Sequence, residues 1–268
     1  MVQGTPGAGL SRMSLLRRAR LALAVAILLS TTRAQAQTRA IGWNPPVDVT
    51  LTLSATTAYA ASVALEPVLA PLRCRWCQRN ALDDHARAAL LWQRPELAAT
   101  ASDVTAFVLT PSAVFGLDAI AASHDRALKG FGVDAILIAE ATMLALDVHE
   151  ITKVVVARER PGVHALRWDE HRAHSPDDDI SFFSGHTTAA FAMVAATGTV
   201  ATMRGYRWAP VPWVVGGALA TGTAYLRIAA DRHWLSDVIV GMLTGVAVGI
   251  AVPLLFHPTS TPVTGAAP

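Results

Sequence analysis

Long apolar segments separated by short polar breaks dominate the chain from about residue 100 onward. Their approximate bounds are 104–122, 133–156, 187–203, 211–230 and 235–256. Glycine and proline punctuate the breaks, and no run alternates apolar and polar residues as a half-buried strand would. The pattern therefore predicts an all-α fold, a helical bundle of about five to six apolar helices.

These segments are long enough to cross a membrane, which takes about 20 residues. Segment 235–256 is nearly uncharged after Asp237, which favours a membrane span. Segment 133–156 instead carries four acidic residues. They are Asp134, Glu140, Asp147 and Glu150. Such acids should face the bundle interior, a cavity or an interface rather than lipid. We expect a membrane-embedded bundle, and a soluble periplasmic bundle is the alternative.

The N-terminus has the layout of a secretory signal peptide. Arginines between positions 12 and 20 precede an apolar run over 21–29, and Ala34-Gln35-Ala36 is a small-x-small pattern. An uncleaved anchor is the other interpretation. The expected organisation is a signal peptide or retained anchor (1–36), an N-terminal segment (37–99), the helical bundle (100–257) and a disordered tail (258–268).

The two cysteines, Cys74 and Cys77, form a lone C-x-x-C pair in the N-terminal segment. It could be a redox pair, half of a zinc site or a local disulfide. Zinc needs four ligands, and His85 alone would not complete a site. Export to an oxidising compartment would make a Cys74–Cys77 disulfide possible.

Composition narrows the functional classes. Apolar residues make up 52% of the chain, charged residues 16%, and the net charge is +2. No basic stripe is interleaved with aromatic residues, so nucleic acid is not an expected partner.

Three polar clusters lie at the ends of apolar segments. In the first, Lys153 and Arg160 are two helical turns apart, so a helix places both cations on one face, and Pro161 ends that helix. In the second, Ser184 and Gly185 precede an apolar run, where free backbone N–H groups at a helix start can bind an oxyanion beside His186. Taken alone, these clusters are better explained as a solvated basic helix end and an ordinary serine N-cap.

The third cluster contains Arg227, His233 and Asp237. His233 and Asp237 are four residues apart, so a helix stacks them on one face. Asp237 could then accept a hydrogen bond from one ring nitrogen of His233 and leave the other nitrogen as an unprotonated nucleophile. A structural His–Asp pair at a helix start is the alternative.

Together the clusters resemble the signature of the type 2 phosphatidic acid phosphatase and vanadium haloperoxidase superfamily. Its pattern is K-x6-R-P, then P-S-G-H, then S-R-x5-H-x3-D, and all spacings are intact between Lys153 and Asp237. Phe183 replaces the usual proline and Leu226 the usual serine, which puts substrate preference in doubt more than activity.

The resemblance implies a metal-independent phosphatase. His233 would attack phosphorus to form a phosphohistidine, Asp237 would orient it, and His186 would act as acid and base. Phosphate oxygens would bind a set of five residues. They are Lys153, Arg160, Ser184, Gly185 and Arg227. No cofactor is expected, although vanadate could occupy the phosphate site.

Several activities fit this site. We expect a phosphorylated lipid or a polyprenyl diphosphate as substrate. A soluble-type periplasmic acid phosphatase for small esters is the alternative, followed by a vanadate-dependent haloperoxidase or a degenerate, inactive site. The loop 162–180, with its histidines and Asp177 to Asp179, should be solvated.

The expected location is the cell membrane, multi-pass, with the active site on the outer, periplasmic side. Basic residues in the breaks near 126–129 and 204–207 would mark the cytoplasmic side. Segment 49–70 conflicts with this if it spans after a cleaved signal, because the site would then face inward. We therefore expect that it packs on the bundle or lies in the interface, or that the signal is retained.

Overall fold

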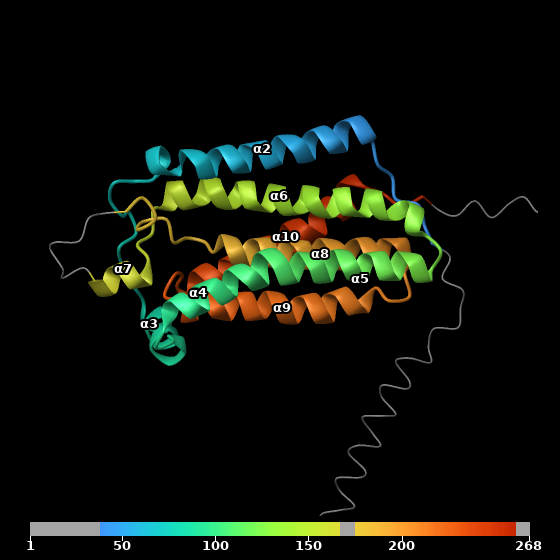
Figure 1. The fold of residues 1–268 in the computed structure, drawn as a ribbon. Helices are drawn as coiled ribbons and strands as arrows, with labels where there is room; N and C mark the ends of the chain where they lie inside the picture. Colours follow the sequence, from blue (N-terminus) through green and yellow to red (C-terminus); the bar gives the residue numbers. More distant parts are fainter. Residues whose placement is uncertain (1–37, 167–174, 261–268) are drawn as a thin grey trace, which may run out of the picture. The chain divides into compact units, whose positions relative to one another are not determined.

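The computed structural model describes residues 38–166 and 175–260, which are almost entirely helical (Figure 1). The elements are α2 (Pro45–Leu69), α3 (Ala81–Leu90), α4 (Pro95–Val104), the π-helical turn η1 (Thr105–Leu109), α5 (Thr110–His124), the 3-10 turn η2 (Leu128–Gly130), α6 (Phe131–Val156), α7 (Pro161–Leu166), α8 (Gly185–Arg204), α9 (Pro210–Ala229) and α10 (Leu235–Phe256). These residues contain no strand, only two isolated bridges. The all-α prediction is confirmed. The expected signal peptide lies outside the described residues.

Proline and glycine residues define several helix ends, close to the ends predicted from the sequence. Pro95 and Pro210 open α4 and α9, because a proline in the first turn loses no intrahelical hydrogen bond. Gly205 ends α8 in the left-handed conformation with φ of 73°, which only glycine adopts without strain.

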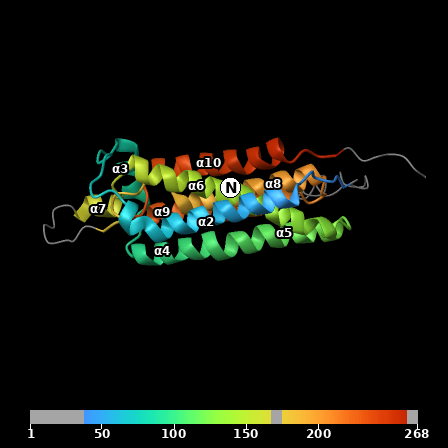
Figure 2. The ribbon, with the colours of Figure 1, turned by 90° about the horizontal axis from the view of Figure 1, so that it is seen from above.

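Helix α8 lies at the centre of the bundle and packs against α6, α9 and α10 (Figures 1 and 2). Small residues allow α10 to lie directly against it. A Cβ atom on Gly245 of α10 would stand 2.5 Å from the Thr188 carbonyl oxygen, and one on Gly249 would stand 2.6 Å from that of Ala192. This close approach fixes the two helices against each other.

The helix directions bring particular ends together. Helices α2, α6 and α9 run one way, while the continuous α4–α5 stretch, α8 and α10 run the other (Figure 1). At one end of the bundle, Ser184 before α8 donates its backbone N–H to the Asp237 carbonyl in the first turn of α10. Arg75 and Trp76 donate theirs to the carbonyl of Ala157, which follows α6. All three sequence clusters therefore fall at the same end.

The N-terminal segment is part of this bundle. Helix α2 is a single helix of 25 residues that packs against α6, and α3 and α4 pack against α9. The described residues on both sides of the boundary expected between 99 and 100 therefore pack against each other. Segment 49–70 packs on the bundle, as expected, but it runs beside α6 along its length in both views (Figures 1 and 2).

The described residues just after α10 are hydrogen-bonded to the chain before α2. The carbonyl oxygen of Pro258 accepts from the Gly42 N–H at 2.8 Å, and the Ser260 N–H donates to the Ala40 carbonyl at 3.0 Å. The chain just before α2 and the chain just after α10 therefore hold each other at the end of the bundle opposite to the sequence clusters. Residues 261–268 lie outside the described part.

Large apolar side chains lie on the outside of the bundle, and several charged side chains are buried inside it together with an apolar core. Val68 of α2 is 81% exposed and Leu255 of α10 is 72% exposed. Asp134, Glu140 and Glu150 of α6 are buried, as the acids of this segment were predicted to be. Two helical stretches, Pro95–His124 and Leu235–Phe256, are long and apolar enough to cross a membrane.

Candidate active site

One cavity of about 240 Å³ lies at the end of the bundle where α8 and α10 begin. Six predicted site residues line it. They are Lys153, Arg160, Gly185, His186, Arg227 and His233. Ser184 and Asp237 lie behind this wall and are fully buried. The fold thus gathers residues that are more than 80 positions apart in sequence into a single site, and we call this end the cavity end.

His233 has one ring nitrogen fixed and the other directed at a cation. Its Nδ1 lies 2.8 Å from the carbonyl oxygen of Ser181. A carbonyl can only accept, so Nδ1 carries the proton and Nε2 keeps its lone pair. Nε2 lies 3.4 Å from Nη1 of Arg160. Burial, together with the charges of Arg160 and Arg227, holds the pKa of His233 well below its ordinary value, so the ring is neutral.

Asp237 does not make the hydrogen bond to His233 that its spacing suggested. Its Oδ2 lies 3.9 Å from Nδ1 of His233, because that nitrogen is bound to the Ser181 carbonyl. Oδ2 instead accepts from the Ser181 hydroxyl at 2.6 Å and from the Trp234 N–H at 3.0 Å. Asp237 therefore orients His233 indirectly, by holding the segment that contains the Ser181 carbonyl and by capping the start of α10.

Arg158 is a buried residue that the sequence analysis did not single out. Its guanidinium binds Asp237 and, at 2.6 Å, Asp83, and all three side chains are at most 1% exposed. The guanidinium also stacks on Trp76 at 4.0 Å. Trp76 lies within the C-x-x-C loop, which the structure closes by a Cys74–Cys77 disulfide. Arg158 therefore connects the C-x-x-C loop and α3 to Asp237, which helps to orient His233.

Arg160 is held by the loop that was expected to be solvated. Its Nε donates to the backbone carbonyl of Asp177 at 2.7 Å, and its Nη2 pairs with the Asp177 carboxylate at 2.6 Å. The neighbouring Asp178 and Asp179 are buried. This part of the loop is thus a structural wall of the cavity. A pairing between residues 17 positions apart across a loop leaves no pattern in the sequence.

Lys153 is held by two carboxylates. Its Nζ lies 2.8 Å from Oε2 of Glu66 on α2 and 2.8 Å from Oε1 of Glu150 on its own helix. The Glu150 pair has the i, i+3 spacing that a helix brings together and could have been found from the sequence. Glu66 could not, because its position depends on how α2 packs. The two acids fix the ammonium before an anion arrives.

A second unpredicted acid, Asp103, connects His186 and Arg227. Its Oδ1 lies 2.8 Å from Nε2 of His186 and 3.7 Å from Nη1 of Arg227. Asp103 lies two residues before the π-helical turn, whose Phe107 packs edge-on against the His186 ring at 4.7 Å. π-Turns of this kind re-aim side chains and are frequent at functional sites.

The start of α8 supports the cavity through its backbone. The Ser184 hydroxyl caps the helix, accepting from the Thr187 N–H at 3.4 Å and from the Thr187 hydroxyl at 2.9 Å, so it faces the helix. Gly185 borders the cavity, and a Cβ there would stand 2.7 Å from Cε1 of His149. Glycine is required because this histidine, which the sequence analysis missed, lies directly over the helix end.

The fold and site define a helical bundle whose helix ends enclose three cations and a neutral histidine. Residues 134–260 match the family model of the PAP2 superfamily. No curated protein matches it significantly. A solved structure described as the first transmembrane PAP2 type phosphatidylglycerolphosphate phosphatase from Bacillus subtilis is 16% identical, with a TM-score of 0.45, over 76% of this chain and 93% of that chain. The chain is a phosphatase, a hydrolase of phosphoric esters.

Proposed function

We propose that the chain dephosphorylates a phosphorylated lipid through a phosphohistidine on His233. The observation that carries the mechanism is the fixed tautomer of His233. Nδ1–H is bound to the Ser181 carbonyl, and Nε2 presents its lone pair to the cavity beside Arg160. A buried, neutral imidazole between cations that bind phosphate oxygens can attack phosphorus without first losing a proton.

The reaction then takes two steps. Nε2 of His233 forms a bond to phosphorus while the ester P–O bond breaks, and His186 gives a proton to the leaving oxygen. Water then attacks the phosphohistidine and gives its proton to His186, which releases inorganic phosphate and restores the neutral His233. The Asp103 carboxylate stabilises the charge on His186, and Arg160 and Arg227 stabilise the transferring phosphoryl group.

Trapping of the intermediate tests this mechanism. Rapid quenching with a ³²P-labelled substrate should give an acid-labile, base-stable phosphoenzyme that is absent in His233→Asn. His85→Asn changes an exposed histidine on α3 and should label normally. Orthovanadate should inhibit by occupying the phosphate site, and a chelator should leave the initial rate unchanged because the protein's own cations stabilise the phosphoryl group. Label in His233→Asn, or turnover that a chelator abolishes, would refute it.

A lipid substrate is favoured by the apolar wall of the cavity. Val63 on α2 and Phe107 on the π-turn both line the cavity, and they are 45% and 52% exposed on the outside of the bundle. The cavity therefore borders the lipid-facing surface between two helices. An acyl or prenyl chain can remain in the membrane there while its phosphate reaches Arg160 and His233.

Substrate preference tests this assignment. Val63→Asp places a charge on the path of the lipid chain and should lower the ratio of kcat/KM for a lipid phosphate to that for p-nitrophenyl phosphate by at least tenfold. Val68→Asp is the matched control, because Val68 lies on the same helix and faces outward at 81% exposure without lining the cavity. Equal ratios in the two variants would favour small soluble esters as substrates.

We further propose a multi-pass arrangement with the cavity end outside the cytoplasm. The Cys74–Cys77 disulfide lies at this end, and disulfides persist in oxidising compartments. Charge alone does not decide the orientation, because residues 71–99 at the cavity end carry five arginines of their own. Since α2 starts at the opposite end, Thr38 is then cytoplasmic. This orientation disagrees with a cleaved signal peptide, because cleavage on the outer side would leave Thr38 there.

Cysteine labelling tests the orientation. Gln93→Cys lies at the cavity end and Lys129→Cys at the opposite end, and both positions are exposed. A membrane-impermeant maleimide should label the first in intact cells and the second only after permeabilisation. The reverse pattern would place the site in the cytoplasm.

A further inference from the structure

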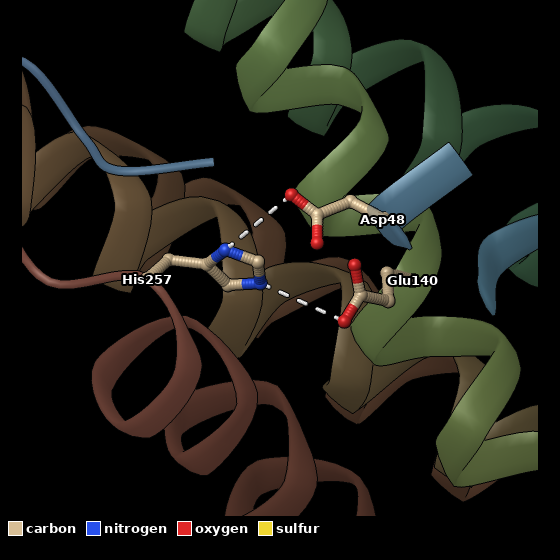
Figure 3. Close-up of side chains that lie close together, drawn as sticks. All are labelled: Asp48, Glu140 and His257. Atoms are coloured by element: carbon tan, nitrogen blue, oxygen red, sulfur yellow. Dashed lines mark ion pairs between the residues drawn. The ribbon is translucent and has the colours of Figure 1, made fainter. Parts of the chain in front are cut away.

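Three side chains with metal-binding groups meet at the end of the bundle opposite to the active site. Asp48 comes from the first turn of α2, Glu140 from α6, and His257 from the residue that ends α10 (Figure 3). All three are buried, with exposures of 6%, 2% and 2%. They are separated by more than 90 residues in sequence, and the catalytic mechanism uses none of them.

Their ligand atoms lie around a common point. Nε2 of His257 is 3.6 Å from Oε1 of Glu140, and Nδ1 is 3.9 Å from Oδ2 of Asp48. One ligand atom from each residue lies within 4.8 Å of the other two. A tetrahedral ion with bonds of about 2.0–2.2 Å holds its ligand atoms roughly 3.3 Å apart. Small side-chain movements would therefore complete a coordination sphere, with water at the remaining positions.

The atoms that face this point lack hydrogen bonds within the described part of the chain. Nε2 of His257 and Oε2 of Glu140 are both buried without a hydrogen-bond partner. Nδ1 of His257 lies 3.3 Å from the Gly42 carbonyl, which can only accept, so Nδ1 carries a proton while Nε2 faces Glu140. Metal-ligating histidines characteristically donate their other N–H to such a carbonyl.

The charges of the two buried carboxylates also favour a bound cation. Two carboxylates are buried with one imidazole, and no described lysine or arginine pairs with either of them. Asp48 gains only the Asn44 N–H, at 2.7 Å from Oδ2. Carboxylates without a nearby lysine or arginine are costly to bury. A divalent ion between them lowers that cost.

We propose that Asp48, Glu140 and His257 bind one divalent transition-metal ion of the Zn²⁺ or Mn²⁺ type. An imidazole with two carboxylates suits these ions, whereas Mg²⁺ and Ca²⁺ prefer oxygen ligands alone. The ligands border a cavity of about 480 Å³ that also contacts Trp43, Leu144 and Phe256, so an ion has a route of entry. Bound metal joins the start of α2 to α6 and to the end of α10.

Metal analysis of the full-length protein in detergent tests the proposal. Protein stripped with chelator should bind about one equivalent of Zn²⁺ or Mn²⁺ by elemental analysis after dialysis, and its melting temperature should rise by at least about 5 °C. Mg²⁺ should do neither. His257→Ala and the isosteric Glu140→Gln should each weaken binding by at least about tenfold. His124→Ala, an exposed histidine at the end of α5, should bind like the wild type.

Two results would overturn the site. In one, the stripped protein binds neither Zn²⁺ nor Mn²⁺ and its melting temperature does not change, so the cluster is a protonated ion network. In the other, metal binds equally in Glu140→Gln and the wild type, so it binds elsewhere. Because the readouts are metal content and stability, they are independent of phosphatase activity, and failure here leaves the proposed function untouched.

Discussion

Arg158 provides a strong test of how the active site is supported. Its replacement by methionine keeps much of the side-chain volume but leaves the carboxylates of Asp83 and Asp237 buried without their cation. Removing one partner of a buried ion pair costs about 3–5 kcal/mol. Both carboxylates keep other donors, from Ser236 to Asp83 and from Ser181 and Trp234 to Asp237, so we expect a loss within this range rather than twice as large.

Thermal unfolding in detergent, followed by tryptophan fluorescence, measures this loss. At roughly 2–4 °C per kcal/mol for a chain of this size, Arg158→Met should melt about 6–20 °C below the wild type. Arg79→Met is the matched control, because Arg79 pairs with Asp84 at 3.6 Å on the surface with 56% of its side chain exposed. Such pairs contribute about 0–1 kcal/mol.

A second variant separates the lost charge pair from lost packing. Arg158→Met combined with Asp83→Asn removes one of the two uncompensated carboxylates and should recover part of the melting temperature. The reasoning fails if Arg158→Met melts within about 4 °C of Arg79→Met, because the buried charges would then cost little. It also fails if the double variant recovers nothing.

Three further predictions concern the cavity. Asp103→Asn removes the charge that supports His186 and should lower kcat by about 10–10²-fold with little change in KM, as steady-state kinetics would show; an unchanged kcat contradicts the role. Gly185→Ala places a Cβ 2.7 Å from the His149 ring and should lower activity, and adding His149→Ala should restore part of it, whereas an active single variant would disprove the clash. The folded state holds His233 neutral, whereas the unfolded chain protonates it below a pH of about 6.5, so the melting temperature should fall from pH 7 to pH 5. His233→Asn should reduce this pH dependence of the melting temperature. An identical pH dependence in the variant and the wild type would contradict the lowered pKa.

The sequence alone determined the helices and the members of the site. Apolar segments of helical length, bounded by residues such as Pro210 and Gly205, place most helix ends within a few residues of their observed positions. The acids of α6 are predicted to be buried because lipid cannot accommodate them. The resemblance of the three spaced motifs to the superfamily signature predicts that Lys153, Arg160 and His233 belong to one site.

Only the tertiary structure decided how those residues are held. Asp237 and His233 share a helix face, but their hydrogen bonds depend on where the Ser181 segment runs, and this segment comes from another part of the chain. Glu66, Asp103 and Arg158 reach their partners across helix contacts that no spacing records. The Asp48–Glu140–His257 cluster forms because the start of α2, a part of α6 and the end of α10 lie close together in the folded bundle. Side chains far apart in sequence meet only after packing fixes helix positions, so burial and partner choice are properties of the folded bundle.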